Sequence, residues 1–275
     1  MALSIDIKNL SRAEELLWGY GVSTPEHIDL DAIAFAQGAT VRYHPLDGCA
    51  ARLIGSDKRA VITINKRDSS SRQRFSLAHE LAHWIRDRGT GSFLCAKEDI
   101  GAHNAEAKGV EESANSYASQ LVLPNYLFDP IARNSKLTLT RAAEIGDLFR
   151  TSLTATAIKL VKRTDLVAFV ICHTKYRREW FIRARRFPEE LWVLDELHAD
   201  TVGFTMLYGT EAGISKVVEE PAARWVSGPQ VYATSARTQS VTLPEGRVLT
   251  IVTLRCELHR HSFTWVSGSL CRSGP

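Results

Sequence analysis

The segment with the clearest chemistry in this chain is His79-Glu80-Leu81-Ala82-His83. In a helix, residues four positions apart lie on the same face one turn apart, so His79 and His83 can ligate one metal ion. Glu80 follows the first histidine and can reach a water molecule beside the metal without being a ligand. Zinc lowers the pKa of such a water to about 7, and a nearby carboxylate can accept its proton as it attacks a carbonyl. The pattern therefore indicates zinc-dependent hydrolysis of peptide bonds.

The residues around this segment predict the helix that the two histidines need. Residues 71–87 contain neither Gly nor Pro, and serines at positions 69, 70 and 71 are good helix N-caps. Apolar side chains recur along the stretch, so one side of the helix can be buried. These side chains are Phe75, Leu77, Ala78, Leu81, Ala82 and Ile85.

A catalytic zinc site usually takes three protein ligands and leaves one position open, so a third ligand is needed. The chain after His83 lacks the Gly and the further His of the metzincin pattern, which excludes that subclass. Residues 110–124 predict a second helix that ends at a proline. Within it, Glu111 can bind the metal while Asn115, one turn later, hydrogen-bonds a ligating histidine. Glu112 is the competing ligand, and a charged first helical turn without any metal is the structural alternative.

These segments resemble those of the ImmA/IrrE-type metallopeptidases, whose zinc helix and second helix are similar to those of thermolysin-like enzymes. The resemblance covers roughly residues 10–130, and its segments occur in the order found in that family. They are Ile62-Thr-Ile-Asn65, Arg74-Phe-Ser-Leu-Ala-His-Glu-Leu-Ala-His83, Glu111-Glu-Ser-Ala-Asn115-Ser-Tyr-Ala118 and Leu121-Val-Leu-Pro124. Ala82 stands where Gly is frequent, and Leu-Val-Leu-Pro replaces the common Leu-Leu-Met-Pro. Neither difference touches a ligand or the general base.

The resemblance implies that His79, His83 and Glu111 hold Zn²⁺, with Mn²⁺ or another divalent ion as the alternative. It also implies that Glu80 activates water and that Asn115 supports a ligating histidine. The enzyme would then be a zinc metalloendopeptidase of the thermolysin-like gluzincin type. Relatives of this layout cleave helix-turn-helix repressors. The implied substrate is therefore such a repressor, whose cleavage derepresses stress-response genes, including DNA-damage or radiation-response genes.

A peptidase also needs a group besides the metal that stabilises the oxyanion of the transition state, usually a His, Tyr or Arg. Tyr117, Tyr126 and His103 are near enough in sequence to be considered. The sequence does not identify which of them has this role.

Residues 1–130 predict an α+β, zincin-like metallopeptidase domain with a small sheet packed on the zinc helix. The expected elements are helices at residues 11–17 and 29–37 and strands at residues 39–43, 51–55 and 60–64. In the resembled peptidases an extended substrate pairs with an exposed strand edge beside the metal. Residues 60–65 are the candidate for that edge, and an ordinary sheet strand is the alternative.

Residues 131–164 predict a helix-turn-helix-like segment. A helix at residues 138–149, a break at 151–152 and a helix at 154–162 lead to this expectation, although the turn lacks the Gly of many such motifs. Residues 133–163 carry seven basic side chains against two acidic ones, a net charge of +5 in a chain whose total is +3. Such a pair of helices can bind DNA phosphates, face solvent or dock an acidic partner, so direct DNA binding stays open.

Residues 165–275 predict a β-rich C-terminal domain with a sensor or regulatory role. The expected strands lie between turn signals, at residues 166–172, 179–183, 202–208 and 247–254. In radiation-response members of the resembled family the C-terminal part is a GAF-like sensor domain, and the resemblance implies the same here. No residue of this region specifies a ligand.

The composition predicts a cytoplasmic protein without a membrane segment. The five cysteines are scattered and form no Cys-x-x-Cys pair, which favours reduced thiols over disulfides. No apolar run reaches the roughly 18 residues of a membrane span, and the first residues lack the features of a signal peptide. The sequence does not determine the oligomeric state.

Two functional hypotheses from different classes follow. The first is a zinc endopeptidase that cleaves a transcriptional repressor at one site. The second is a non-catalytic, zinc-containing DNA-binding or sensor regulator of transcription. A structural zinc site is closed and needs no free carboxylate, so Glu80 favours the first hypothesis.

Overall fold

The computed structural model of the chain divides into two compact units, residues 1–164 and 165–275. The residues that the structure describes are 9–56, 58–87, 105–133, 135–229, 231 and 234–256. They form a mixed α+β protein whose C-terminal region is rich in strands, which confirms the predicted fold class at this level. Among these residues, no helix combines the length and the apolar character that crossing a bilayer requires.

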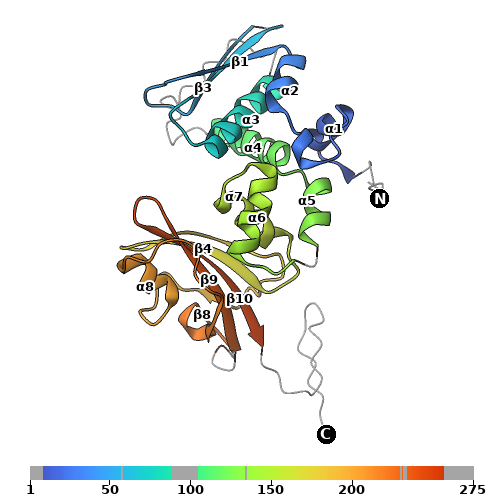
Figure 1. Ribbon diagram of the computed structural model, residues 1–275. Helices are drawn as coiled ribbons and strands as arrows, with labels where there is room; N and C mark the ends of the chain where they lie inside the picture. Colours follow the sequence, from blue (N-terminus) through green and yellow to red (C-terminus); the bar gives the residue numbers. More distant parts are fainter. Residues whose placement is uncertain are drawn as a thin grey trace. The chain divides into compact units, whose positions relative to one another are not determined.

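The first unit contains a small sheet and most of the helices of the chain (Figure 1). Its helices are α1 (Arg12–Gly19), the 3-10 helix η2 (Pro25–His27), α2 (Leu30–Ala36), α3 (Ser70–Asp87), α4 (Ala105–Val122), α5 (Asn125–Ala132), α6 (Leu139–Phe149) and α7 (Leu153–Arg163). Its strands are β1 (Ala39–His44), β2 (Ala51–Gly55) and β3 (Ala60–Asn65). The two helices that the sequence predicts around the metal ligands are therefore present as α3 and α4.

The three strands form a mixed sheet in the order β1-β3-β2. β3 pairs in parallel with β1, from Ala60 opposite Ala39 to Asn65 opposite His44, and antiparallel with β2. The expectation that residues 60–65 form an exposed edge is therefore wrong, because this strand has hydrogen-bonded neighbours on both sides. Its nearly continuous apolar character is typical of a central strand. The two edges of this sheet are β1 and β2.

α3 is held against the sheet and against α4, which lies beside it (Figure 1). Leu77 and Leu81 are fully buried, and burying each such side chain stabilises the fold by about 1.5–3 kcal/mol. The indole nitrogen of Trp84 donates a 2.8 Å hydrogen bond to the carbonyl oxygen of Gln37. Gly55 in β2 lies so near this indole that an added Cβ would be 3.1 Å from the ring. β2 therefore packs directly on the half of α3 that contains His83.

Asn65, the last residue of β3, joins the loop between β1 and β2 to the chain that leads into α3. Its side-chain nitrogen donates to the carbonyl oxygens of Leu46 and Cys49 at 3.0 and 3.1 Å. Its side-chain oxygen accepts from the backbone nitrogens of Leu46 and Arg67 at 3.2 and 3.1 Å. Both donors and both acceptor positions of the amide are used, so the start of α3 is firmly positioned.

The buried carboxylate of Glu14 connects α1 with α5. One oxygen accepts hydrogen bonds from the backbone nitrogen and hydroxyl of Ser11 at 2.9 and 2.8 Å, which completes a capping box at the start of α1. The other oxygen accepts from the backbone nitrogens of Asn125 and Tyr126 at 2.6 and 3.3 Å. The first N–H groups of α5 thereby find an acceptor that its N-cap residue, Pro124, does not supply.

α6 and α7 form a helix–break–helix pair. Arg150, the C-cap of α6, has a φ of 54°, in the left-handed region that favours glycine. Ser152 then caps α7 by accepting a 3.2 Å hydrogen bond from the backbone nitrogen of Ala155. A 2.9 Å hydrogen bond between the hydroxyls of Thr151 and Thr156 ties the break to α7. The break at residues 151–152 that the sequence predicts is present.

The second unit is built on an antiparallel five-stranded sheet in the order β5-β4-β10-β9-β7. Its strands are β4 (Ala168–Thr174), β5 (Arg178–Arg183), β6 (Trp192–Val193), β7 (Val218–Pro221), β8 (Val226–Ser227), β9 (Thr234–Leu243) and β10 (Arg247–Cys256). Its helices are α8 (Val202–Tyr208) and the 3-10 helix η4 (Ala222–Arg224). β6 and β8 form a separate two-stranded sheet.

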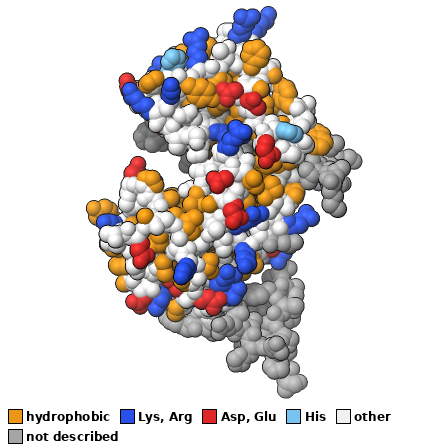
Figure 2. Space-filling view, viewed as in Figure 1, with side chains coloured by type: hydrophobic (Ala, Val, Ile, Leu, Met, Phe, Trp, Pro, Cys, Tyr) orange, Lys and Arg blue, Asp and Glu red, His pale blue; other side chains and the backbone are white. Residues whose placement is uncertain are grey.

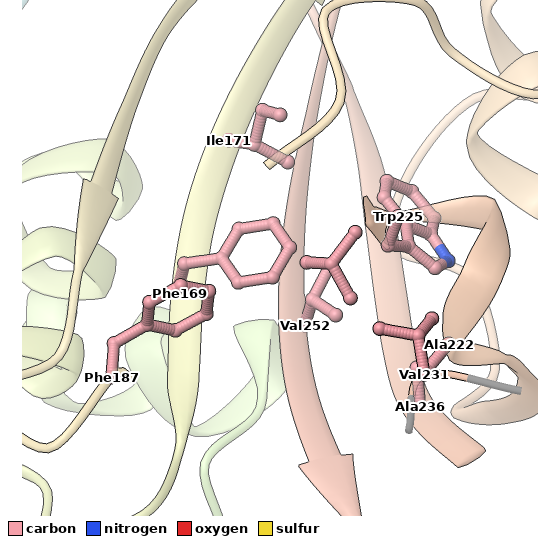
Figure 3. Close-up of a cluster of buried hydrophobic side chains, with 9 residues drawn as sticks. Phe169, Ile171, Phe187, Ala222, Trp225, Val231, Ala236 and Val252 are labelled. Atoms are coloured by element: carbon pink, nitrogen blue, oxygen red, sulfur yellow. The ribbon is translucent and has the colours of Figure 1, made fainter. Parts of the chain in front are cut away.

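One face of the five-stranded sheet carries the hydrophobic core of the second unit. Figure 3 shows Phe169 and Ile171 of β4 and Val252 of β10 in this cluster, with Trp225 on the side of η4. The indole nitrogen of Trp225 donates a 2.7 Å hydrogen bond to the buried carboxylate of Glu220. The polar atom of the largest side chain in the core is thereby satisfied.

Residues 202–208 form α8, so the prediction of a strand there is wrong. β-branched and aromatic residues in this run favour a strand locally. Two contacts instead favour the helix. The side chain of Thr201 caps its first turn, and the carboxylate of Glu220 accepts a 3.0 Å hydrogen bond from the backbone nitrogen of Val202, the first residue of α8. The apolar side of α8 packs against Val248 of the sheet. These contacts come from residues outside the run and outweigh its local preference.

Candidate metal centre

α3 places His79 and His83 side by side, as their spacing predicts. Their Nε2 atoms are 3.1 Å apart, and their ring centroids are 4.7 Å apart. The side chain of His83 is 3% exposed and that of His79 is 18% exposed. One imidazole is therefore buried in the unit, and the other is closer to solvent.

α4 brings Glu111 to the same point. Its Oε2 lies 3.3 Å from Nε2 of His79, and its Oε1 lies 3.3 Å from Nε2 of His83. The three side chains each offer one ligand atom, and these atoms lie within 4.8 Å of one another. Glu112 is exposed and is not part of this cluster, so the geometry favours Glu111 between the two carboxylates that the sequence left open.

The donor set of this cluster fits a divalent metal. Two imidazole nitrogens and a carboxylate oxygen, all with lone pairs directed to one point, repel one another unless a proton or a cation lies between them. Burial lowers the pKa of His79, and the neighbouring His83 adds to this effect. The neutral ring that can ligate a metal is therefore the favoured form of His79.

Asn115 determines how the ring of His79 is oriented. Its Oδ1 lies 3.1 Å from Nδ1 of His79, one helical turn after Glu111. Because a side-chain carbonyl oxygen only accepts hydrogen bonds, Nδ1 carries the proton and donates it to Asn115. The lone pair on Nε2 then points to the cluster, which is the tautomer that a metal ligand requires.

Glu80 is buried next to this cluster but is not part of it. Its residue is 5% exposed, and its Oε2 has no hydrogen-bond partner among the described residues. Burial, with a smaller contribution from the charge of Glu111, raises the pKa of Glu80 to about 8. A buried carboxylate oxygen without a partner is costly, so this atom marks a place where a water or a substrate group completes the site.

The three candidates for oxyanion stabilisation have different outcomes. The hydroxyl of Tyr126 donates a 2.7 Å hydrogen bond to the carbonyl oxygen of Val22 and is buried there, so it serves packing. Burial raises the pKa of Tyr117, a half-buried residue of α4. His103 lies outside the described residues. Tyr126 is therefore not assigned this role.

Several basic side chains of the segment at residues 133–163 are buried or form ion pairs within the first unit. Lys159 is 8% exposed, and burial lowers its pKa to about 8. Arg163 forms an ion pair with Asp129, and Arg141 forms one with Glu144 at 2.8 Å. On the face shown in Figure 2, acidic and basic side chains are interspersed. The charge that this segment can offer to DNA phosphates is therefore smaller than its net charge of +5 indicates.

A family model matches the part of the chain that contains the His-His-Glu cluster. Residues 34–161 match the peptidase family model described as the IrrE N-terminal-like domain. The match includes every residue of the candidate metal centre. It confirms the resemblance to this family that was inferred from the sequence.

The proteins similar to this chain include a bacterial metalloprotease and a protein of solved structure. The Radiation response metalloprotease IrrE of Deinococcus deserti is 26% identical over 166 residues, an alignment that covers 59% of this chain and 57% of that protein. The chain thus spans little more than half the length of this relative. The solved structure of a Mycobacterium tuberculosis transcriptional regulator matches with a TM-score of 0.54 and 15% identity, over 94% of this chain and 92% of that chain. The second similarity concerns the fold alone.

Proposed function

We propose that this protein is a zinc-dependent endopeptidase of the thermolysin-like gluzincin type. The observation that carries the proposal is the convergence of His79, His83 and Glu111, with Glu80 buried beside them and its Oε2 without a hydrogen-bond partner among the described residues. Two imidazoles and one carboxylate are a ligand set that catalytic zinc sites use, with one coordination position left for the reaction. Mn²⁺ is the alternative ion for the same donors.

In the proposed mechanism, different residues of the chain have separate roles in peptide hydrolysis. When bound, zinc would supply Lewis-acid polarisation of the scissile carbonyl. Glu80 accepts a proton from the attacking water and then delivers it to the leaving amine. Its burial supports this role, because a raised pKa allows the same group to accept and to release a proton near neutral pH. Asn115 keeps the ring of His79 in its ligating orientation.

The three-stranded sheet of the first unit has edges with which an extended substrate can pair. β3 is central, so a peptide that adds to this sheet has the edges β1 and β2 to pair with. β2 packs on α3 through Gly55 and Trp84, and we therefore propose β2 as the edge that pairs with substrate. Backbone pairing of this kind binds a chain without requiring one particular sequence.

The proposed substrate is a helix-turn-helix transcriptional repressor, cleaved at one site. Its loss would derepress stress-response genes, including those that respond to DNA damage or radiation. The name of one similar protein supports this proposal, since it is a radiation response metalloprotease. The β-rich second unit would then act as a sensor, GAF-like in the proposal, that controls cleavage.

The test uses the purified full-length chain loaded with Zn²⁺ and the product of a neighbouring repressor gene. One defined cut is expected, and it should disappear on addition of a chelator. Glu80→Gln should keep the metal and lose cleavage, whereas His79→Ala should lose both. Glu112→Gln is the matched control, because it changes an exposed carboxylate next to a proposed ligand and should cleave like the wild type. Undiminished cleavage by Glu80→Gln contradicts the assignment.

A regulator that binds DNA without catalysis is the second candidate, and the helix–break–helix pair α6–α7 is the observation that favours it. This candidate predicts a complex with DNA whose affinity falls steeply with salt, and no loss of function in Glu80→Gln. The engagement of Lys159, Arg141 and Arg163 within the first unit counts against it.

A further inference from the structure

A short strip of side chains leads from the candidate metal centre along the accessible face of α3. Arg72, Phe75 and His79 are three and four residues apart, so they lie on one face of this helix. The ring centroid of Phe75 is 6.5 Å from that of His79. Phe75 is half-buried and Arg72 is exposed. With two helical turns between Arg72 and His79, the strip is about 10 Å long.

Arg72 differs from Arg67 and Arg74 in having no recorded partner for its guanidinium among the described residues. Arg67 forms a 2.9 Å ion pair with Asp47, and the guanidinium of Arg74 donates a 3.0 Å hydrogen bond to a backbone carbonyl oxygen. The guanidinium of Arg72 has no acidic partner within the part of the chain that the structure describes, and its backbone nitrogen donates to the hydroxyl of Ser69.

The guanidinium of Arg72 and the apolar ring of Phe75, beside the candidate metal centre, suit a particular kind of peptide. An extended chain advances about 3.3 Å per residue, so a strip of this length matches about three residues of substrate. A carboxylate is the group that a guanidinium binds best, and the N-terminal end of a helix also favours a negative charge. The ring of Phe75, which lies between Arg72 and the metal centre, suits an apolar side chain at an intermediate position.

We propose that Arg72 and Phe75 form a subsite that selects peptides with an acidic side chain about three residues from the cleaved bond and an apolar side chain between them. This inference rests on the proposed peptidase function and adds a substrate class to it. A free C-terminal carboxylate has the same chemistry as an Asp or Glu side chain. The test must therefore distinguish an internal acidic residue from the end of a chain.

The experiment uses the zinc-loaded full-length protein and fluorogenic decapeptides that are acetylated and amidated at their ends. The peptides carry Glu, Gln or Lys in turn at every position around one cleavable bond, and a parallel set has a free C-terminus. At one position, about three residues from the bond, the Glu peptide should be cleaved with about a fivefold higher kcat/KM than the Gln peptide. The difference should lie in KM and should shrink at high salt.

Substitutions at Arg72 and Phe75 then test which residue causes each substrate preference. Arg72→Gln should remove the preference for Glu, and Arg72→Glu should replace it with a preference for Lys. Phe75→Leu, which keeps an apolar side chain for folding, should weaken discrimination between large and small apolar residues at the intermediate position. Arg177→Gln is the matched control, because it removes an equally exposed arginine from the second unit and should leave all preferences unchanged.

The outcomes separate this inference from the proposed function. Cleavage without a preference for Glu, or with one that survives Arg72→Gln, overturns the inference and leaves the peptidase intact. A preference for the free C-terminus over an internal Glu also overturns it. If no peptide is cleaved, the peptidase proposal loses its support. The subsite is then tested by fluorescence anisotropy, which measures how tightly the same peptides bind to zinc-loaded Glu80→Gln. Equal binding of the Glu and Gln peptides there overturns the inference as well.

Discussion

Replacing Asn115 by Ala should weaken metal binding and leave the fold intact. The side chain is exposed on α4, and its Oδ1 accepts the 3.1 Å hydrogen bond from Nδ1 of His79. Ala is the best helix former, so the substitution should not destabilise α4. It removes the interaction that holds the imidazole in its ligating tautomer and orientation. Loss of such a partner typically lowers metal affinity about 10- to 100-fold, which corresponds to about 1.4–2.7 kcal/mol.

Competition with a chromophoric chelator at neutral pH measures this change in Zn²⁺ affinity, and urea unfolding of the metal-free protein checks the fold. Asn115→Asp should retain most of the affinity, because a carboxylate oxygen accepts the same hydrogen bond. Ser116→Ala is the control, since Ser116 is exposed on the same helix next to Asn115. Wild-type affinity in Asn115→Ala, or an equal loss in Ser116→Ala, would refute the role assigned to this amide.

Three further substitutions test the packing of the two units. Glu14→Gln should lower the free energy of unfolding in urea by about 1–3 kcal/mol, because one acceptor oxygen of a buried cap becomes a donor, whereas the exposed Glu15→Gln should have little effect. Arg150→Gly should raise the melting temperature, by an amount that corresponds to about 1 kcal/mol, since it relieves a left-handed φ of 54°. Arg150→Ala, which keeps a Cβ, should bring no such gain. His173 is 1% exposed, and its burial lowers its pKa from 6.5 to about 4. Below pH 6.5 the imidazole of His173 binds a proton in the unfolded chain, whereas in the folded protein it stays neutral until about pH 4. The free energy of unfolding should therefore fall by about 3 kcal/mol as the pH drops to 4. Urea titrations across this pH range should show a smaller loss for His173→Phe, and identical slopes would contradict the assignment.

Patterns within one turn or one strand were sufficient to predict the elements that carry the site. The spacing of His79 and His83 predicts a shared helix face, and both histidines lie side by side on α3. The helix expected at residues 11–17 is present as α1, which begins with the Ser11 capping box. The spacing of Glu111 and Asn115 predicts that both face a histidine, and both do. Each of these predictions depends on neighbours along the chain, whose geometry the helix itself sets.

The choices between alternatives needed contacts that no local pattern contains. Glu111 and Glu112 are both acidic residues of α4, and only the packing of this helix on α3 directs one of them to the imidazoles. The central place of β3 depends on pairing with two strands at once. Lys159 looks like part of a basic face in the sequence and is buried in the structure.

The second unit shows most clearly that local sequence patterns do not contain these contacts. β9 was not predicted, because its Thr and Ser residues look like a polar loop, yet Thr238 and Ser240 are buried and hydrogen-bonded inside the sheet structure. Residues 202–208 have the composition of a strand and fold as a helix through Glu220 and the sheet below them. Composition and spacing determine which chemistry this chain can carry and which short segments can hold it. The rotation of one helix against another, the order of strands and the burial of a polar side chain are decided by tertiary packing, because their energies belong to pairs of segments distant in the sequence.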